Sequence, residues 1–154
     1  MSLESVLTTF DPLYLLCLIP LLLLTGLVVF DAYRERKKYQ RFLRELEGTE
    51  FFCYTNRKNG EQFVKEEILP KLDPNMQVIH LRGRKAVSEL EEKYISQALY
   101  NVKQVGFPNV MKVVRGKMLD VSLHNDFYNV INQGKTADDF LAILNERVTE
   151  LRNK

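Results

Sequence analysis

Residues 106–123 read GFPNVMKVVRGKMLDVSL, and this stretch decides the fold that we predict for most of the chain. Val110–Val114 and Met118–Leu123 are rich in branched and apolar residues, which is typical of β-strands. Arg115–Lys117 lies between them, contains a glycine and is short enough for a tight turn. We therefore expect the two strands to pair as an antiparallel hairpin.

Upstream of this hairpin, predicted strands and helices alternate. Glu50–Thr55 and Met76–Leu81 are short runs of aromatic and aliphatic residues, as in strands. Gly60–Leu72 and Ser88–Val102 carry apolar residues at helical spacing. Because strands that alternate with helices usually pair in parallel, we expect a parallel pair beside the hairpin.

Downstream of the hairpin, Thr136–Arg152 is predicted to form the last helix. Thr136 is a suitable N-cap, and the acidic residues that follow it suit a helix N-terminus. His124–Lys135 is either a long loop that binds a partner or a short helix packed on the sheet. The fold class is α/β, with the element order β-α-β-α-β-β-α over residues 49–154.

This element order is similar to the core of the thioredoxin-like fold, over about residues 50–150. Gly106–Pro108, directly before the Val110 strand, resembles the loop in which thioredoxins carry a cis-proline opposite their active site. The resemblance therefore implies that Pro108 lies beside the end of the first strand. The sequence alone does not show whether the bond before Pro108 is cis.

The chain departs from thioredoxins at their reactive motif. The resemblance places a Cys-x-x-Cys motif where the first strand passes to its helix, but Asn56–Asn59 reads NRKN. Cys53 lies earlier, within the strand, and has no second cysteine beside it. Because a thiolate is needed for disulfide exchange, we predict no dithiol redox activity and no catalytic residue. We interpret Cys53 as a small buried hydrophobic residue.

The other common kinds of site are not indicated. His80 and His124 lack partners at metal-ligand spacing, so we interpret both as structural residues. No nucleotide-binding glycine motif is present, and we predict neither a cofactor nor a metal. A net charge of +2 gives no argument for nucleic-acid binding.

A group of basic residues is the strongest remaining indication of a binding site. Arg82, Arg84 and Lys85 follow the second predicted strand, at the edge of the sheet where α/β folds usually bind ligands. With Arg57 and Lys58 they could form one basic rim. Such a rim would bind phosphate, an anionic lipid headgroup or an acidic segment of a partner, or would simply be a solvated loop.

The N-terminal region suggests a membrane anchor. Pro12–Phe30 has no charged residue and is long enough to cross a bilayer core of roughly 30 Å as a helix. We therefore expect a short leader at residues 1–11, a transmembrane helix at 12–31 and a basic juxtamembrane helix at 32–48. By the positive-inside rule, the leader lies outside and residues 49–154 lie in the cytoplasm. The basic residues expected at the membrane surface are Arg34, Arg36, Lys37, Lys38 and Arg41.

These features support three hypotheses. The first is an integral single-pass membrane protein whose non-catalytic thioredoxin-like domain acts as an interaction or scaffold module, in a subunit or assembly factor of a membrane complex. It implies at least one protein partner. The second is an enzyme that uses the Cys53 thiol, or a phosphate ligand held by Arg82, Arg84 and Lys85. The third is a peripheral sensor of anionic lipids.

Overall fold

The computed structural model describes residues 12–154 except 84, 89, 101 and 103–105, with side chains described from residue 18 onward except at 58 and 59. The chain divides into two units, Met1–Gln40 and Arg41–Lys154, which are described separately.

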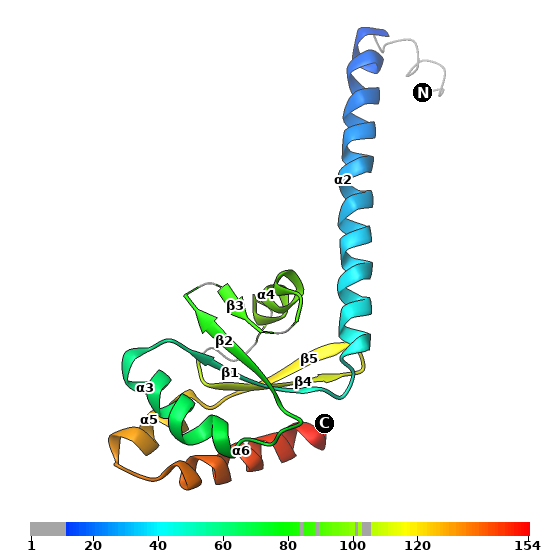
Figure 1. The fold of residues 1–154 in the computed structure, drawn as a ribbon. Helices are drawn as coiled ribbons and strands as arrows, with labels where there is room; N and C mark the ends of the chain where they lie inside the picture. The colour runs from blue at the N-terminus through cyan, green and yellow to red at the C-terminus, as the bar shows by residue number, and fades with distance from the viewer. Residues whose placement is uncertain (1–11, 84, 89, 101, 103–105) are drawn as a thin grey trace, which may run out of the picture. The chain divides into compact units, whose positions relative to one another are not determined.

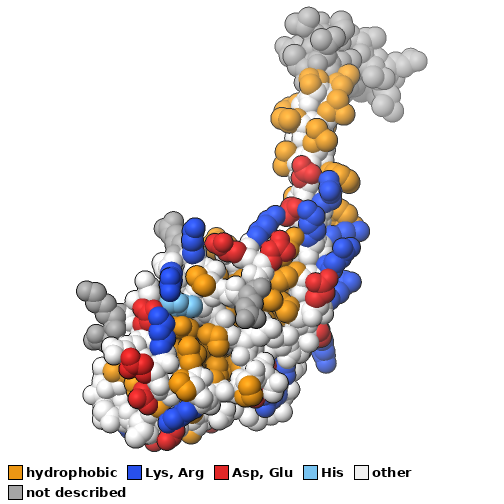
Figure 2. All heavy atoms as spheres, in the orientation of Figure 1, with side chains coloured by type: hydrophobic (Ala, Val, Ile, Leu, Met, Phe, Trp, Pro, Cys, Tyr) orange, Lys and Arg blue, Asp and Glu red, His pale blue; other side chains and the backbone are white. Residues whose placement is uncertain are grey.

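A single helix, α2, runs from Pro12 to Glu45 (Figure 1). Its described apolar stretch extends from Leu18 to Phe30, and large hydrophobic side chains along it are exposed (Figure 2). Asp31 follows directly after Phe30. Among the residues with described side chains, no helix is long and apolar enough to cross a membrane.

This finding corrects two predictions, the transmembrane helix at residues 12–31 and the integral single-pass location that depended on it. Within the residues whose side chains are described, the uncharged stretch runs only from Leu18 to Phe30 and ends at Asp31. The predicted leader at 1–11 and the side chains of residues 12–17 lie outside the described residues.

The second unit is built on one mixed sheet of five strands in the order β3-β2-β1-β4-β5 (Figure 1). β1 pairs in parallel with β2, as the alternation of strands and helices predicted, and the other pairs are antiparallel. The strands are β1 (Glu50–Thr55), β2 (Gln77–Arg82), β3 (Lys85–Val87), β4 (Asn109–Val114) and β5 (Lys117–Ser122).

The predicted hairpin is present as β4 and β5. Val114 pairs with Lys117, so the turn between them is only Arg115 and Gly116. Both turn residues have positive φ, 53° and 65°, which is the backbone of a type I′ turn and suits the twist of a hairpin. Lys117, which we had placed in the turn, therefore belongs to the second strand.

The segment after β2 differs from the prediction. Arg82 and Lys85 are register partners, so this basic segment turns back as a second hairpin and forms the edge strand β3. Ala86 is buried in that strand. The helix predicted to begin at Ser88 begins later, because α4 spans Glu92–Tyr100.

The remaining helical elements lie after β1 and after β5. After β1, the chain forms α3 (Lys58–Phe63), one π-helical turn η1 (Val64–Ile68) and a 3-10 turn η2 (Leu69–Lys71). The segment after β5 is a helix, α5 (His124–Asn132), which settles the choice between loop and short helix. The last helix, α6 (Ala137–Arg152), begins with a capping box in which Thr136 and Asp139 exchange hydrogen bonds.

Buried side chains cover both faces of the sheet. α3, η1, α5 and α6 lie on one side, and α4 lies on the other (Figure 1). The core on the first side includes Phe52 of β1, Phe127 of α5 and Phe140 of α6, whose rings meet edge to face. On the second side, Phe42 near the end of α2 packs on Tyr94 of α4, with ring centroids 5.2 Å apart.

Truncation of Phe140 tests this core. Phe140 is fully buried between Phe52 and Phe127. Phe140→Ala should lower the free energy of unfolding by about 3–5 kcal/mol, because it removes buried apolar area and leaves a cavity. The measurement is urea denaturation followed by circular dichroism. Glu146→Ala, on the exposed side of α6, is the control and should change stability by less than about 0.5 kcal/mol.

Candidate functional site

The junction between β1 and α3 is the position at which the resemblance to thioredoxins implies a reactive dithiol. The backbone N–H of Asn56 donates to the Leu81 carbonyl at 3.2 Å, which holds the junction against β2. Arg57 has an extended backbone and precedes the first turn of α3, with its side chain exposed. Lys58 begins α3, but its side chain lies outside the described residues. The junction therefore presents a guanidinium group and no thiol.

Cys53 is the nearest thiol in the chain and is fully buried in the central strand. Its register partners are Ile79 of β2 and Asn109 of β4, so strands flank it on both sides. Burial raises the pKa of the Cys53 thiol, because the thiolate would lose its hydration. The group therefore stays protonated near neutral pH, which argues against the Cys53 form of the second hypothesis but does not bear on its phosphate-ligand form.

A loop ending in a cis Phe107–Pro108 bond precedes β4. The Pro108 carbonyl accepts a hydrogen bond from the Leu123 N–H at 2.9 Å. His124 Nδ1 lies 2.9 Å from the Phe107 carbonyl oxygen. Gly106 has a φ of 128°, and a Cβ there would come within 2.8 Å of His124 Cβ. His124 and the end of β5 therefore fix the position of this loop.

The structure brings Pro108 and Arg57 to one small hollow between the proline loop and the β1–α3 junction. Its volume is about 10 Å³, which is room for about one water molecule. The lining residues include Tyr54, Thr55, Gly60 and Tyr128. The hollow therefore has no space for a small-molecule substrate.

A cluster of ionisable side chains lies near the carboxyl ends of β1 and β2. Tyr54 and His80 are register partners, and their rings stack with centroids 4.5 Å apart. His80 Nε2 lies 3.3 Å from Glu61 Oε1, without the alignment of a hydrogen bond. Lys65 Nζ lies 2.7 Å from the same oxygen. This cluster was not predicted, because only the register of β1 and β2 brings Tyr54 to His80.

The charges of this cluster follow from burial and pairing. Burial lowers the pKa of His80, and this effect outweighs the opposing effect of the Glu61 carboxylate. The hydrogen bond from Lys65 lowers the pKa of Glu61. Burial also raises the pKa of Tyr54. At neutral pH the cluster therefore holds a neutral imidazole beside an ion pair.

The structure describes the side chains of three residues of the predicted basic rim, Arg57, Arg82 and Lys85. Arg82 and Lys85 are exposed register partners across the β2–β3 hairpin. Arg57 lines the hollow beside Pro108. Arg84 and the side chain of Lys58 lie outside the described residues. The structure thus shows one pair of neighbouring cations at this edge of the sheet.

The basic residues of α2 are exposed, and several contact neighbours on their own helix. Lys38 pairs with Glu35 at 2.9 Å. Arg34 and Lys37 lie over the rings of Phe30 and Tyr33, at 5.8 Å and 4.7 Å from the centroids. Arg36 and Arg41 are exposed as well. The predicted contact of these residues with anionic lipid headgroups stays a prediction.

Metal ligands do not converge in the described part of the chain. Among those residues, no group of three or more His, Cys, Asp or Glu side chains could hold a metal ion. His80 and Glu61 are close together, but the Glu61 oxygen beside His80 is already paired with the Lys65 ammonium group.

The protonation state of Cys53 can be tested by thiol labelling. In a Cys17→Ser variant of the chain, Cys53 should react with a dithiobis-nitrobenzoate reagent at least about 100-fold more slowly in buffer than in guanidinium chloride, since only opened molecules expose the thiol. The release of thionitrobenzoate measures the rate. Comparable rates in the two solvents would show that the thiol is accessible and would restore the enzyme hypothesis.

The state of His80 predicts a pH dependence of stability. The pKa of His80 is lower in the folded chain than in the unfolded chain, so the unfolded chain binds more protons as pH falls below about 6.5. The free energy of unfolding should therefore fall between about pH 7.5 and about pH 5.5. His80→Phe keeps a ring on Tyr54 and removes the titration, so its stability should fall less over this window.

Urea denaturation of both chains at the two pH values measures this difference. Glu61 does not confound it, because the hydrogen bond from Lys65 lowers the pKa of Glu61 further below this window. An equal loss of stability in the two chains would mean that His80 is not held neutral by its surroundings.

Comparison with known proteins adds no relative to this account. No protein-family model matches the chain, and neither a curated protein nor a solved structure matches it. The function is therefore argued from the junction at Arg57, the loop at Pro108 and the charged groups near Arg82.

Proposed function

We propose that this chain is a non-catalytic interaction module that binds a protein partner through a thioredoxin-like domain, as a scaffold or assembly subunit. The observation that carries the proposal is the absence of a reactive thiol at the β1–α3 junction. Residues 56–59 contain no cysteine, and Cys53 is enclosed in the central strand. The domain therefore has a thioredoxin-like arrangement of strands and helices but lacks the cysteine that acts as nucleophile in thioredoxins.

The topology supports the thioredoxin-like part of the proposal. Four of the strands follow the order β2-β1-β4-β5, with the first pair parallel and the others antiparallel. A cis-proline, Pro108, directly precedes β4 and shares a hollow with the β1–α3 junction. Both features are those that the resemblance of the sequence implied.

The geometry of the ionisable cluster supports the non-catalytic part. The His80 side chain is about nine-tenths buried, and Glu61 is already paired with Lys65. The hollow that adjoins Tyr54 has room for about one water molecule. A general acid or base must reach its substrate within hydrogen-bond distance, and this arrangement leaves no space for one.

Affinity capture tests the proposal and separates it from thiol chemistry. The full chain and its Cys53→Ser variant are captured in parallel under mild conditions, and the associated proteins are quantified by mass spectrometry. We expect one stoichiometric partner with both chains, and no reduction of insulin disulfides by either. Loss of the partner in the variant, or a disulfide between Cys53 and the partner, would contradict the proposal.

A further inference from the structure

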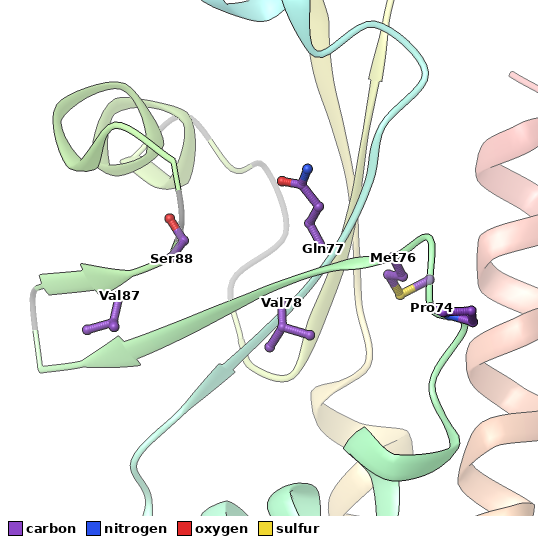
Figure 3. Close-up of a pocket in the computed structure, with 6 residues that line it drawn as sticks. All are labelled: Pro74, Met76, Gln77, Val78, Val87 and Ser88. Atoms are coloured by element: carbon purple, nitrogen blue, oxygen red, sulfur yellow. The ribbon is translucent and has the colours of Figure 1, made fainter.

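A groove of about 560 Å³ lies at the edge of the sheet where β3 ends (Figure 3). Its lining residues are Pro74, Met76, Gln77, Val78, Val87 and Ser88. β3 pairs only with His80–Arg82 of β2. Among the described residues, Gln77–Ile79 have a strand on the β1 side and none on the other side. The groove therefore follows an open stretch of strand edge.

The groove reaches around this edge to both faces of the sheet. Val78 and Val87 point to the same side of β2 and β3, whereas Gln77 and Ser88 point to the opposite side (Figure 3). Val87 is 50% exposed although it lies within a strand. Alternate residues of an open edge also direct backbone N–H and C=O groups outward. The groove thus offers both apolar contacts and hydrogen-bonding groups.

Positive charge lies on the valine side of this edge. Side chains two residues apart share a face, so Arg82 lies on the same side as Val78 and His80, and Lys85 on the same side as Val87. Glu61, beside His80, is paired with Lys65. Arg82 and Lys85 form no ion pair with another described residue. Figure 2 shows hydrophobic side chains gathered on one face of this unit, with Lys, Arg, Asp and Glu side chains around them.

We propose that the open edge of β2, from Gln77 to Ile79, binds an extended acidic segment of a protein partner, which adds to the sheet as a strand. Branched apolar side chains of the segment would contact Val78 and Val87, and a carboxylate at the end nearest β3 would pair with Lys85 or Arg82. Strand addition uses the backbone groups for affinity and alternate side chains for specificity. The inference rests on the proposed function, since it assigns the surface of the interaction module.

An extended strand fits the groove better than a helix does. A helix satisfies its own backbone groups, so it would leave the outward groups of Gln77–Ile79 unpaired. The groove also admits contacts on both faces of the edge, which only a segment lying in the plane of the sheet can make. The positive charges of Arg82 and Lys85 favour an acidic segment over a basic one.

A synthetic peptide provides the test. The probe is a fluorescein-labelled peptide of about six residues, in which threonine and valine alternate and two glutamates end the chain. Its control carries lysines in place of the glutamates. Binding to the full chain is measured by fluorescence anisotropy, and hydrogen exchange of the Gln77–Ile79 amides is measured with and without peptide. We expect saturable binding of the acidic peptide and slower exchange at those of the Gln77–Ile79 amides that point away from β1.

Two variants test the contacts. Val87→Asp places a carboxylate in the groove and should weaken binding of the acidic peptide at least about tenfold. Lys85→Glu should weaken binding of the acidic peptide several-fold. It should leave the stability of the domain unchanged, because Lys85 is exposed. Tyr100→Asp is the matched control, since Tyr100 is 90% exposed on α4 and lies outside the groove. Its binding should equal that of the parent chain.

Three results would overturn the inference. They are unchanged exchange at Gln77–Ile79, equal binding of the acidic and basic peptides, and full binding by the Val87→Asp chain. Sedimentation that shows a dimer lost on Val87→Asp would also overturn it, because a second copy would then occupy the edge. If Val87→Asp still captures the stoichiometric partner, the interaction module stands and only this surface is wrong.

Discussion

The structure depends on the burial of β1 at the centre of the sheet. Phe51, Phe52 and Cys53 are fully buried, and β1 is paired on both edges. A strand in this position has one register on each side, because a slip by one residue would move its side chains to the wrong faces. The register with β2 places Tyr54 against His80, and the register with β4 brings Asn109, next to Pro108, opposite Cys53.

The same burial keeps the Cys53 thiol from acting as a nucleophile. Cys53 contributes apolar contact at the middle of β1, and the enclosure that makes it useful there also keeps it protonated. At the other end of β1, Glu50 accepts two hydrogen bonds from Arg152, at 2.7 Å and 2.8 Å, which lower the pKa of the carboxyl group. Burial thus keeps the Cys53 thiol unreactive, while the ion pair between Glu50 and Arg152 attaches α6 to the sheet.

Local sequence signals predicted the parts of the fold that local interactions determine. The β4–β5 hairpin and the Thr136 cap of α6 depend on residues close together in the chain, and both were predicted. β3 was missed because Lys85–Val87 is too short to show alternation, and it forms only where β2 offers an edge. The cluster at His80 depends on the pairing of distant strands. The transmembrane prediction rested on the uncharged run from Pro12 to Phe30, whereas the helix as described, with side chains from Leu18 onward, is not long and apolar enough to cross a membrane.

An open strand edge can pair with strands of other molecules, and β3 and the open stretch of β2 differ in the features that prevent such pairing. β3 is only three residues long and has Lys85 at its start, and short charged edge strands resist association. Among the described residues, no strand pairs with Gln77–Ile79 on the side away from β1, and Val78 and Val87 line the groove there. Because Arg82 and Lys85 lie at one end of this stretch, they repel basic segments and attract acidic ones. The same charges that limit indiscriminate pairing therefore make the remaining opening selective.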